Sequence, residues 1–313
     1  MDYRYPRCEA VPLAGQQVSL RVDGGERVRW HFGSEYPRPF FYPLLGPSGN
    51  SLTRMGHPGA PNHDHHRSIW FAHNKVVGID FWSDNLPPRI RQSQWLVYED
   101  GDEEALMAVM LRWFDGHNPE HLLEQELIAT VRPLGDGETL LSLQSTFRPR
   151  AEMLEFGKTN FGFLAVRVAR SISKVFGNGQ LTSSEGRVGE PQTFGRPARW
   201  MDYSGPVLKL PADQGAWVVE GITYFDHPSN PRYPAPWHVR DDGWMGSAIC
   251  LNEPLLTTRE KPLVLRYRLH AHGGPIDPAR ADAVARQFAG SPAYTIRSDR
   301  IPHRQYQVVR TAE

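Results

Sequence analysis

The stretch "HLLEQELIATVRPLGDGETLLSLQSTFRP", residues 121–149, decides the fold class. Two runs rich in strand-forming residues flank "LGDG", which is a turn signal. In the second run Leu141 and Leu143 alternate with Ser142 and Gln144, and this period of two is typical of a half-buried β-strand. The stretch therefore predicts two neighbouring strands joined by a short turn.

The same pattern recurs along most of the chain. "QVSLRVD" (17–23) and "RVRWHF" (27–32) flank "GGE" and predict a β-hairpin. The clear exception is "DPARADAVARQFAG" (277–290), where Asp277 is placed to cap the start of a helix. Because strands dominate and crossover helices are almost absent, we predict an all-β fold: a large antiparallel β-sandwich with a short C-terminal helix, in a single domain over residues 1–313.

Composition and charge exclude several classes of partner. The 313 residues include 35 basic and 35 acidic ones and have a formal net charge of zero, so no global field favours nucleic acid or an anionic membrane. No run of 18 apolar residues is present, and the N-terminus lacks the pattern of a signal peptide. We therefore expect a soluble, cytoplasmic protein that binds neither nucleic acid nor membrane. The sequence does not indicate an oligomeric state.

Three long segments interrupt the strands, at residues 36–84, at 156–169 together with 183–205, and at 225–244. Each mixes aromatic residues with His, Asn, Asp and Arg. Long ordered connections in a compact domain are usually functional. We expect these segments to line a polar pocket with apolar walls.

The first segment contains "HPGAPNHDHHRSIWFAHN" (57–74), which holds five of the thirteen histidines. This cluster has three interpretations: a metal site, a pocket that binds substrate and transfers protons, or a polar loop that is held by histidine hydrogen bonds. For metal, the candidate ligands are His57, His63, His65 and His66. They suit a divalent transition metal, although the cation of Arg67 beside them opposes one. No cofactor fingerprint is present otherwise.

A pocket for a carbohydrate or polyol needs aromatic faces, hydrogen-bonding groups and a side chain that exchanges protons near neutral pH. The candidate catalytic residues are His65, His66, His227, His238, Asp226 and Glu185. The candidate substrate-binding residues are Arg67, His73, Trp70, Trp82, Lys158, Asn160, Arg167, Asn230, Trp237 and Asp241. The arginines would hold a ring oxygen or a carboxylate, the tryptophans would stack on the sugar, and Lys158 and Asn160 would stabilise developing negative charge.

These segments also suggest how the pocket is built. The histidine segment would form one wall, "FDHPSNPRYPAPWHVR" (225–240) the opposite wall and "KTNFGFLAVR" (158–167) the floor. We expect this pocket at an open end of the sandwich. The arrangement requires His65, His66, His227 and His238 to lie around one cavity.

Four motifs carry a resemblance to a known family. They are "RPFFYPLLGPSGNSLTR" (38–54), "DHHRSIWFAHNKVVGIDFWSD" (64–84), "KTNFGFLAVRVA" (158–169) and "GITYFDHPSNPRYPAPWHVR" (221–240). With them the chain resembles the PmoA-like family, soluble bacterial proteins of unknown function that carry the label "methane oxygenase PmoA". The resemblance further implies a relation to the galactose-mutarotase-like supersandwiches, which bind carbohydrates. Methane oxidation in a membrane is not inferred, because the chain lacks apolar runs long enough to span one.

The leading functional prediction is an enzyme that acts on a sugar through His and carboxylate acid/base chemistry, as an epimerase, lyase or hydrolase. Two alternatives stay open. One is a metal-dependent enzyme that uses the histidine cluster. The other is a glycan-binding protein without catalytic activity, which needs the aromatic residues but no proton-transfer group.

Overall fold

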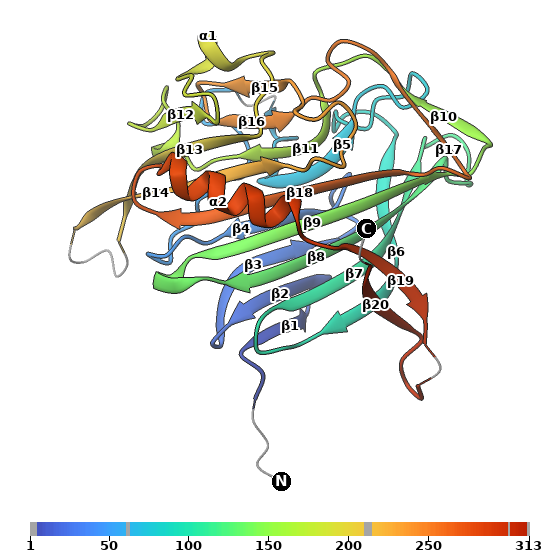
Figure 1. The fold of residues 1–313 in the computed structure, drawn as a ribbon. Coiled ribbons are helices and arrows are strands. Elements are labelled where there is room, and N and C mark those ends of the chain that lie inside the picture. Colours follow the sequence, from blue (N-terminus) through green and yellow to red (C-terminus); the bar gives the residue numbers. More distant parts are fainter. Residues whose placement is uncertain (1–4, 61–62, 210–214, 300, 312–313) are drawn as a thin grey trace.

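The computed structural model describes residues 5–60, 63–209, 215–299 and 301–311, and two eight-stranded antiparallel sheets dominate this part of the chain (Figure 1). The first sheet has the order β1 (Cys8–Leu13), β2 (Gln17–Val22), β3 (Gly25–His31), β4 (Phe40–Leu44), β5 (Ile69–His73), β11 (Gly162–Arg167), β16 (Trp244–Ser247) and β15 (Trp237–Arg240). The second has the order β12 (Gln180–Ser183), β13 (Trp200–Leu208), β14 (Trp217–Asp226), β18 (Leu263–Gly273), β9 (Thr139–Pro149), β8 (Leu123–Pro133), β7 (Ala105–Phe114) and β6 (Arg89–Glu99).

Smaller elements complete the fold. Two further strand pairs are β10 (Met153–Phe156) with β17 (Leu255–Thr258) and β19 (Ala293–Ser298) with β20 (Tyr306–Thr311). The helices are α1 (Glu190–Thr193) and α2 (Pro278–Ala289), with single 3-10 turns at Gly135–Gly137 and Arg170–Ile172. None of the helices in the described ranges is both long and apolar enough to cross a membrane. The predicted large antiparallel sandwich with a short C-terminal helix is confirmed.

The stretch 121–149 forms β8 and β9, which pair along their whole length as antiparallel strands. Leu141 and Leu143 point into the sandwich, as predicted. Ser142 and Gln144 were expected to face solvent, but both are buried. Gln144 exchanges hydrogen bonds with the backbone of Tyr294, at 2.7 and 2.9 Å, because the hairpin β19–β20 lies over this face of the sheet.

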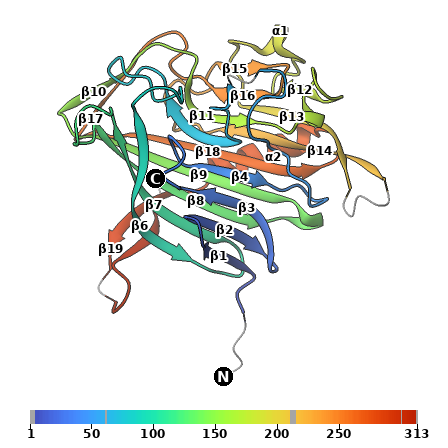
Figure 2. The ribbon, with the colours of Figure 1, turned by 180° about the vertical axis from the view of Figure 1, so that it is seen from behind.

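One apolar cluster fills the space between the two sheets. It joins Leu127 and Leu141 of the second sheet to Ile69, Phe163 and Val166 of the first. A single domain over residues 1–313 stays a prediction, but this continuous cluster is what such a domain requires. Figure 2 shows the first sheet running from β1 at its lower edge to β15 and β16 at its upper edge.

The outer face of the second sheet is covered by α2, which packs on Trp200 and Phe225 (Figure 1). The helix begins where the sequence predicts, because the side chain of Asp277 accepts hydrogen bonds from the backbone N–H groups of Ala279 and Arg280. This part of the face is therefore covered by the chain itself.

The outer face of the first sheet carries a separate aromatic cluster and is where the long segments gather. Side chains alternate across the sheet, so Trp70 of β5 and Ala165 of β11 belong to this outer cluster, whereas Ile69 and Leu164 belong to the core. The strand register places Trp70, Ala165, Gly246 and His238 in one row across β5, β11, β16 and β15. This row underlies the candidate site.

Candidate functional site

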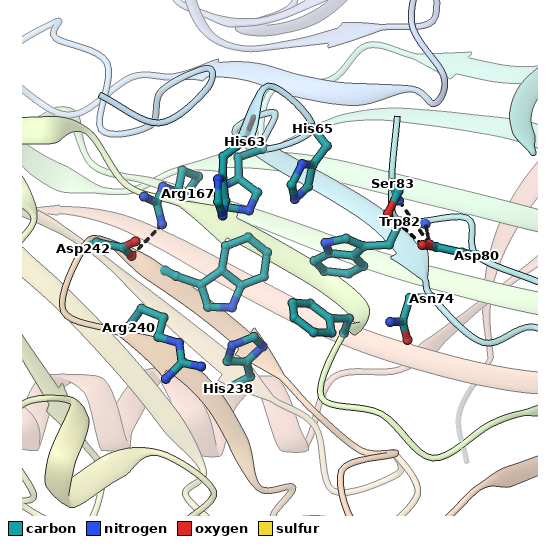
Figure 3. Close-up of a pocket in the computed structure, with 13 residues that line it drawn as sticks. His63, His65, Asn74, Asp80, Trp82, Ser83, Arg167, His238, Arg240 and Asp242 are labelled. Carbon is teal, nitrogen blue, oxygen red and sulfur yellow. Dashed lines mark hydrogen bonds and ion pairs between the residues drawn. The ribbon is translucent and has the colours of Figure 1, made fainter. Parts of the chain in front are cut away.

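A cleft with a volume of about 380 Å³ lies over the outer face of β5, β11, β16 and β15 (Figure 3). Its volume falls within the range of roughly 300–1,000 Å³ that is usual for small-molecule pockets. The expected position at an open end of the sandwich is wrong, because the cleft opens on the face of a sheet whose other side is core. Its lining comes from parts of the predicted segments, at 63–83, 161–167 and 238–244, whereas residues 183–205 do not contribute.

The floor of the cleft is aromatic. Trp82, Trp244 and Phe161 line it, and their rings contact one another with centroids 5.4 Å apart for the two tryptophans and 5.5 Å apart for Trp82 and Phe161. In the row beneath, the small side chain of Ala165 and the absence of one at Gly246 allow the indoles to lie over the sheet. The indole N–H groups of Trp82 and Trp244 are buried and have no partner within the described residues.

The wall above the floor consists of histidines. His63, His65 and His66 line the cleft, with ring centroids 4.3–5.4 Å apart. Burial, together with the nearby Arg38, lowers the pKa of His65 to about 4. Burial and the charge of Arg167 lower the pKa of His66 further below its ordinary value. The rings of the half-buried His65 and the buried His66 are therefore neutral at pH 7.

The predicted metal ligands are not arranged as a ligand set. Throughout the described residues, no three His, Cys, Asp or Glu side chains are placed to hold a metal ion. The ring of His57 lies 5.3 Å from that of His63, but its Nε2 donates to Asp242 over 2.9 Å and its Nδ1 accepts from the backbone of Gly59. Both nitrogens are thus engaged within the protein, and Arg167 holds the same aspartate.

The wall opposite the histidine cluster comes from β15. His238 and Arg240 face the cleft, whereas Trp237 and Val239 alternate into the core. Nδ1 of His238 lies 3.0 Å from the carbonyl oxygen of Asn160, which can only accept, so Nδ1 carries the proton and Nε2 a lone pair. Burial, followed by the charge of Arg240, lowers the pKa of His238 to about 4.

One end of the cleft is formed by Arg167 and Asp242, which pair through Nη1 and Oδ1 at 2.7 Å (Figure 3). Burial alone would raise the pKa of Asp242, but Arg167 and His57 hold it below its ordinary value. Arg167 is the cross-strand partner of Trp244, so the register of β11 and β16 places this cation beside the aromatic floor.

The other end is polar and carries Asn74, Asp80 and Ser83 (Figure 3). Asp80 accepts from the backbone N–H groups of Trp82 and Ser83, at 2.6 and 3.1 Å, and from the Ser83 hydroxyl at 2.7 Å. These bonds fix the turn that presents Trp82. The side-chain oxygen of Asn74 is buried without a partner in the described part of the chain.

Three predicted catalytic residues lie elsewhere, so the first half of the 225–240 loop does not form a wall. Asp226 is buried and accepts from the Asn230 amide and from the backbone of His227 and Ala235. The ring of His227 bonds to Ser229 and to the carbonyl oxygen of Phe288 in α2. These residues fix the loop and the helix.

Glu185, the third predicted catalytic residue outside the cleft, is 44% exposed and lies near Arg199. Several predicted substrate-binding residues also lie outside it. Arg67 pairs with Asp84, His73 faces the core against Phe156 and Phe163, and Lys158 is exposed. The pairing and the burial explain why Arg67 and His73 cannot reach a ligand.

The remaining predicted binding residues have structural contacts of their own. Asn160 contributes only its carbonyl oxygen to His238, and Asn230 bonds to Asp226 and to Arg266. Trp237 donates to Ala198 within the core, Asp241 caps α1 at Glu190, and Trp70 lies against Trp82 and Trp244 in the floor. Of the residues predicted to bind substrate, Trp82 and Arg167 line the cleft.

The cleft also contains residues that the sequence analysis did not single out: Asn74, Asp80, Ser83, Phe161, Arg240, Asp242 and Trp244. All of them lie inside the three long segments. A strict period of two along 237–240 would have excluded Trp237 and included Arg240. The pairing of Trp244 with Arg167 depends on strand register, which the sequence does not show.

Comparisons with known proteins leave the function open. Residues 17–286 match the sequence pattern of DUF6807, a family of unknown function. No curated protein matches the chain. A crystal structure of 4-alpha-glucanotransferase from Thermococcus litoralis is similar at a TM-score of 0.34 and 9% identity, covering 86% of this chain but 40% of that one. The chain thus spans well under half of that enzyme's length, and no functional inference rests on a likeness this low. The resemblance to the PmoA-like family stays a prediction.

Proposed function

The chain belongs to DUF6807, a family of unknown function, and we propose that it is a carbohydrate-directed enzyme that transfers a proton to or from a bound sugar. The observation that carries this proposal is the combination of an aromatic floor with neutral histidines on two facing walls (Figure 3). Among the enzymes that transfer a proton in this way, we propose an epimerase or a lyase.

Sugar binding is supported by shape and by unsatisfied groups. A volume of about 380 Å³ corresponds to roughly a dozen waters at about 30 Å³ each, and a hexose has about the same number of heavy atoms. Trp82 and Trp244 offer faces for the apolar side of a sugar ring. Their unpartnered indole N–H groups and the unpartnered oxygen of Asn74 match the acceptors and donors of sugar hydroxyls.

Proton transfer is supported by His238. Its Nδ1 is anchored to the Asn160 carbonyl, so the ring presents an unprotonated Nε2 as a base at pH 7. Arg167, whose side chain is almost fully buried, lies at the end of the same cleft and would stabilise negative charge that develops on the substrate.

Hydrolysis is less well supported than epimerisation or elimination. The common glycosidase mechanism uses two carboxyl groups, one of which must hold a proton near neutral pH. In this cleft Asp242 is held ionised by Arg167 and His57, with its pKa below the ordinary value. Both side-chain oxygens of Asp80 already accept hydrogen bonds, from the backbone of Trp82 and from the Ser83 hydroxyl.

Replacement of Trp244 by Ala is expected to weaken sugar binding by about thirtyfold, because truncating a buried aromatic anchor typically costs about 2 kcal/mol. Isothermal titration calorimetry with a panel of hexoses measures this loss. Trp244→Phe, which keeps a ring, should retain most of the affinity. Trp217→Ala is the matched control, since Trp217 is 64% exposed and lies outside the cleft. Equal losses in Trp217→Ala and Trp244→Ala would contradict the site.

Incubation with a bound sugar in deuterium oxide is expected to place deuterium on a ring or chain carbon, as followed by proton NMR. His238→Gln should slow this exchange by about a hundredfold or more, because general bases contribute that much. His117→Gln, at an exposed turn, should leave it unchanged. Since the pKa of His238 is lowered to about 4, exchange should persist at pH 5 and fall only as the pH approaches 4. Tight binding without any exchange would leave a glycan-binding protein.

A further inference from the structure

Four arginines near the cleft share two acidic residues. Arg38 and Arg67 share the carboxylate of Asp84, through contacts of 3.0 and 2.5 Å. Arg54 and Arg167 share Asp242: Arg167 pairs with its carboxylate, and Arg54 donates to its backbone oxygen at 3.0 Å. Each pair of arginines thus has one acidic partner.

This surplus is largely removed from water. The side chains of Arg38 and Arg167 are both 1% exposed. Burial, with Arg167 next to it, lowers the pKa of Arg54 to about 9. Burying a cation without a matching anion costs several kcal/mol in general, so an anionic ligand that paired with these arginines would offset part of that cost.

Some N–H donors of Arg167 make no hydrogen bond within the described residues. Its Nη1 is used by Asp242, but Nε and Nη2 are buried and have no partner in the described ranges of the chain. These two groups form one edge of the guanidinium plane, and two parallel N–H donors on such an edge match the two oxygens of a carboxylate. Arg240 differs, because it is 44% exposed and pairs with Glu190 at 2.6 Å.

The opposite end of the cleft has the reverse character. Asp80 and Asn74 lie there, across the floor from Arg167 (Figure 3). A ligand with an anionic group at one end and hydroxyl donors at the other would complement both ends. A neutral sugar would leave the arginine edge without a partner, which is unfavourable for buried donors.

We propose that the ligand of this cleft is an acidic sugar, such as a uronic or other sugar acid, whose carboxylate binds the Nε and Nη2 edge of Arg167. The inference rests on the proposed function, since it names the class of sugar for the same cleft. His66 lines the same cleft, and its Nδ1 is also buried without a partner in the described chain.

Calorimetry on the unmodified protein tests the proposal. Glucose, galactose and mannose are each compared with the corresponding uronate, and glucose 6-phosphate serves as an anion of different shape. At least one uronate is expected to bind about tenfold or more tightly than its parent hexose, because charge-assisted bidentate hydrogen bonds are roughly twice as strong as neutral ones. Its affinity should fall as sodium chloride is raised.

Variants of Arg167 test whether this residue causes the preference for uronates over hexoses. Arg167→Met should abolish the uronate preference while a neutral hexose still binds, and Arg167→Lys, which keeps the charge but not the fork, should keep part of it. Arg170→Met removes the same charge from an exposed neighbouring position and should keep the full preference. Circular dichroism and thermal unfolding show whether each variant folds. If Arg167→Met does not fold, the uronate preference of Arg167→Lys decides the test.

Three other results of the calorimetry would overturn one or both proposals. Hexoses that bind as well as their uronates would overturn the acidic-sugar inference and leave the proposed function standing. Tighter binding of glucose 6-phosphate than of every uronate would overturn the carboxylate assignment. Binding of neither hexose nor uronate would overturn the proposed function together with the inference.

Discussion

Replacement of Asp226 by Ala is expected to lower the free energy of unfolding by about 3 kcal/mol, because it breaks a buried hydrogen-bond network. Asp226 is fully enclosed and accepts from Asn230 at 2.7 Å and from the backbone of Ala235 and His227 at 3.0 Å each. The truncation leaves three donors buried without a partner, and each such donor costs about 1–3 kcal/mol, not fully additively.

Urea unfolding followed by circular dichroism measures this effect. Glu185→Ala is the matched control, because Glu185 is an acidic residue of the same predicted catalytic set but is 44% exposed. Its loss should stay within about 0.5 kcal/mol. A stable Asp226→Ala variant that loses only deuterium exchange would instead restore Asp226 as a catalytic residue and contradict the structural role.

The fold class could be predicted because its signals are local. The turn "LGDG" and the alternation after it are visible within residues 121–149, and β8 and β9 form there. The burial of Gln144 could not be predicted, since it depends on Tyr294, which is far away in the sequence. Period-two patterns report which residues share a face, but not whether a distant hairpin covers that face.

The candidate site was located by segment but not residue by residue. His65, His66 and His238 do meet around one cleft with Arg167 and Trp82. Composition cannot separate a histidine that lines a cleft from one that pins a loop, because both roles use the same ring nitrogens. The direction of a side chain follows from strand register.

His227 and Asp226 illustrate this limit. Together with Asn230 they look like catalytic groups in "FDHPSNP", yet their hydrogen bonds run to Phe288 in α2 and to Arg266 in β18. The partners lie tens of residues away in the sequence. The polar side chains of this loop are therefore explained by its burial, because buried backbone N–H and C=O groups need hydrogen-bond partners.

Lowering the pH from 7 to 4.5 is expected to remove about 4 kcal/mol from the free energy of unfolding, because several histidines are buried in the neutral form. Burial lowers the pKa of His73 to about 3 and that of His238 to about 4, against about 6.5 in an unfolded chain. Between these values the unfolded chain binds more protons, so stability falls as the pH falls. Each of these two histidines contributes about 2 kcal/mol to the loss.

The net change also includes groups that act in the opposite sense. His65 and His227, both with a pKa of about 4, add to the loss, and so does His66, whose pKa lies lower still. Asp226 offsets about 2 kcal/mol, since burial raises its pKa to about 6 and the folded protein then takes up the proton before the unfolded chain does. Because these further histidines outweigh the offset by Asp226, the net loss should reach at least about 4 kcal/mol.

Urea midpoints at pH 7, 5.5 and 4.5 measure this dependence, and its slope counts the protons taken up on unfolding. His73→Gln and His238→Gln should each reduce that uptake by up to about one proton, whereas Asp226→Asn should steepen the slope because it removes the offset. His117→Gln and Glu185→Gln make the same changes of net charge at exposed positions, so equal changes of slope in these variants would indicate a general effect of net charge instead. A stability that stays level between pH 7 and 4.5 in the unmodified protein would show that the histidines take up protons in the folded state, so that the imidazole rings of the cleft are charged at pH 4.5.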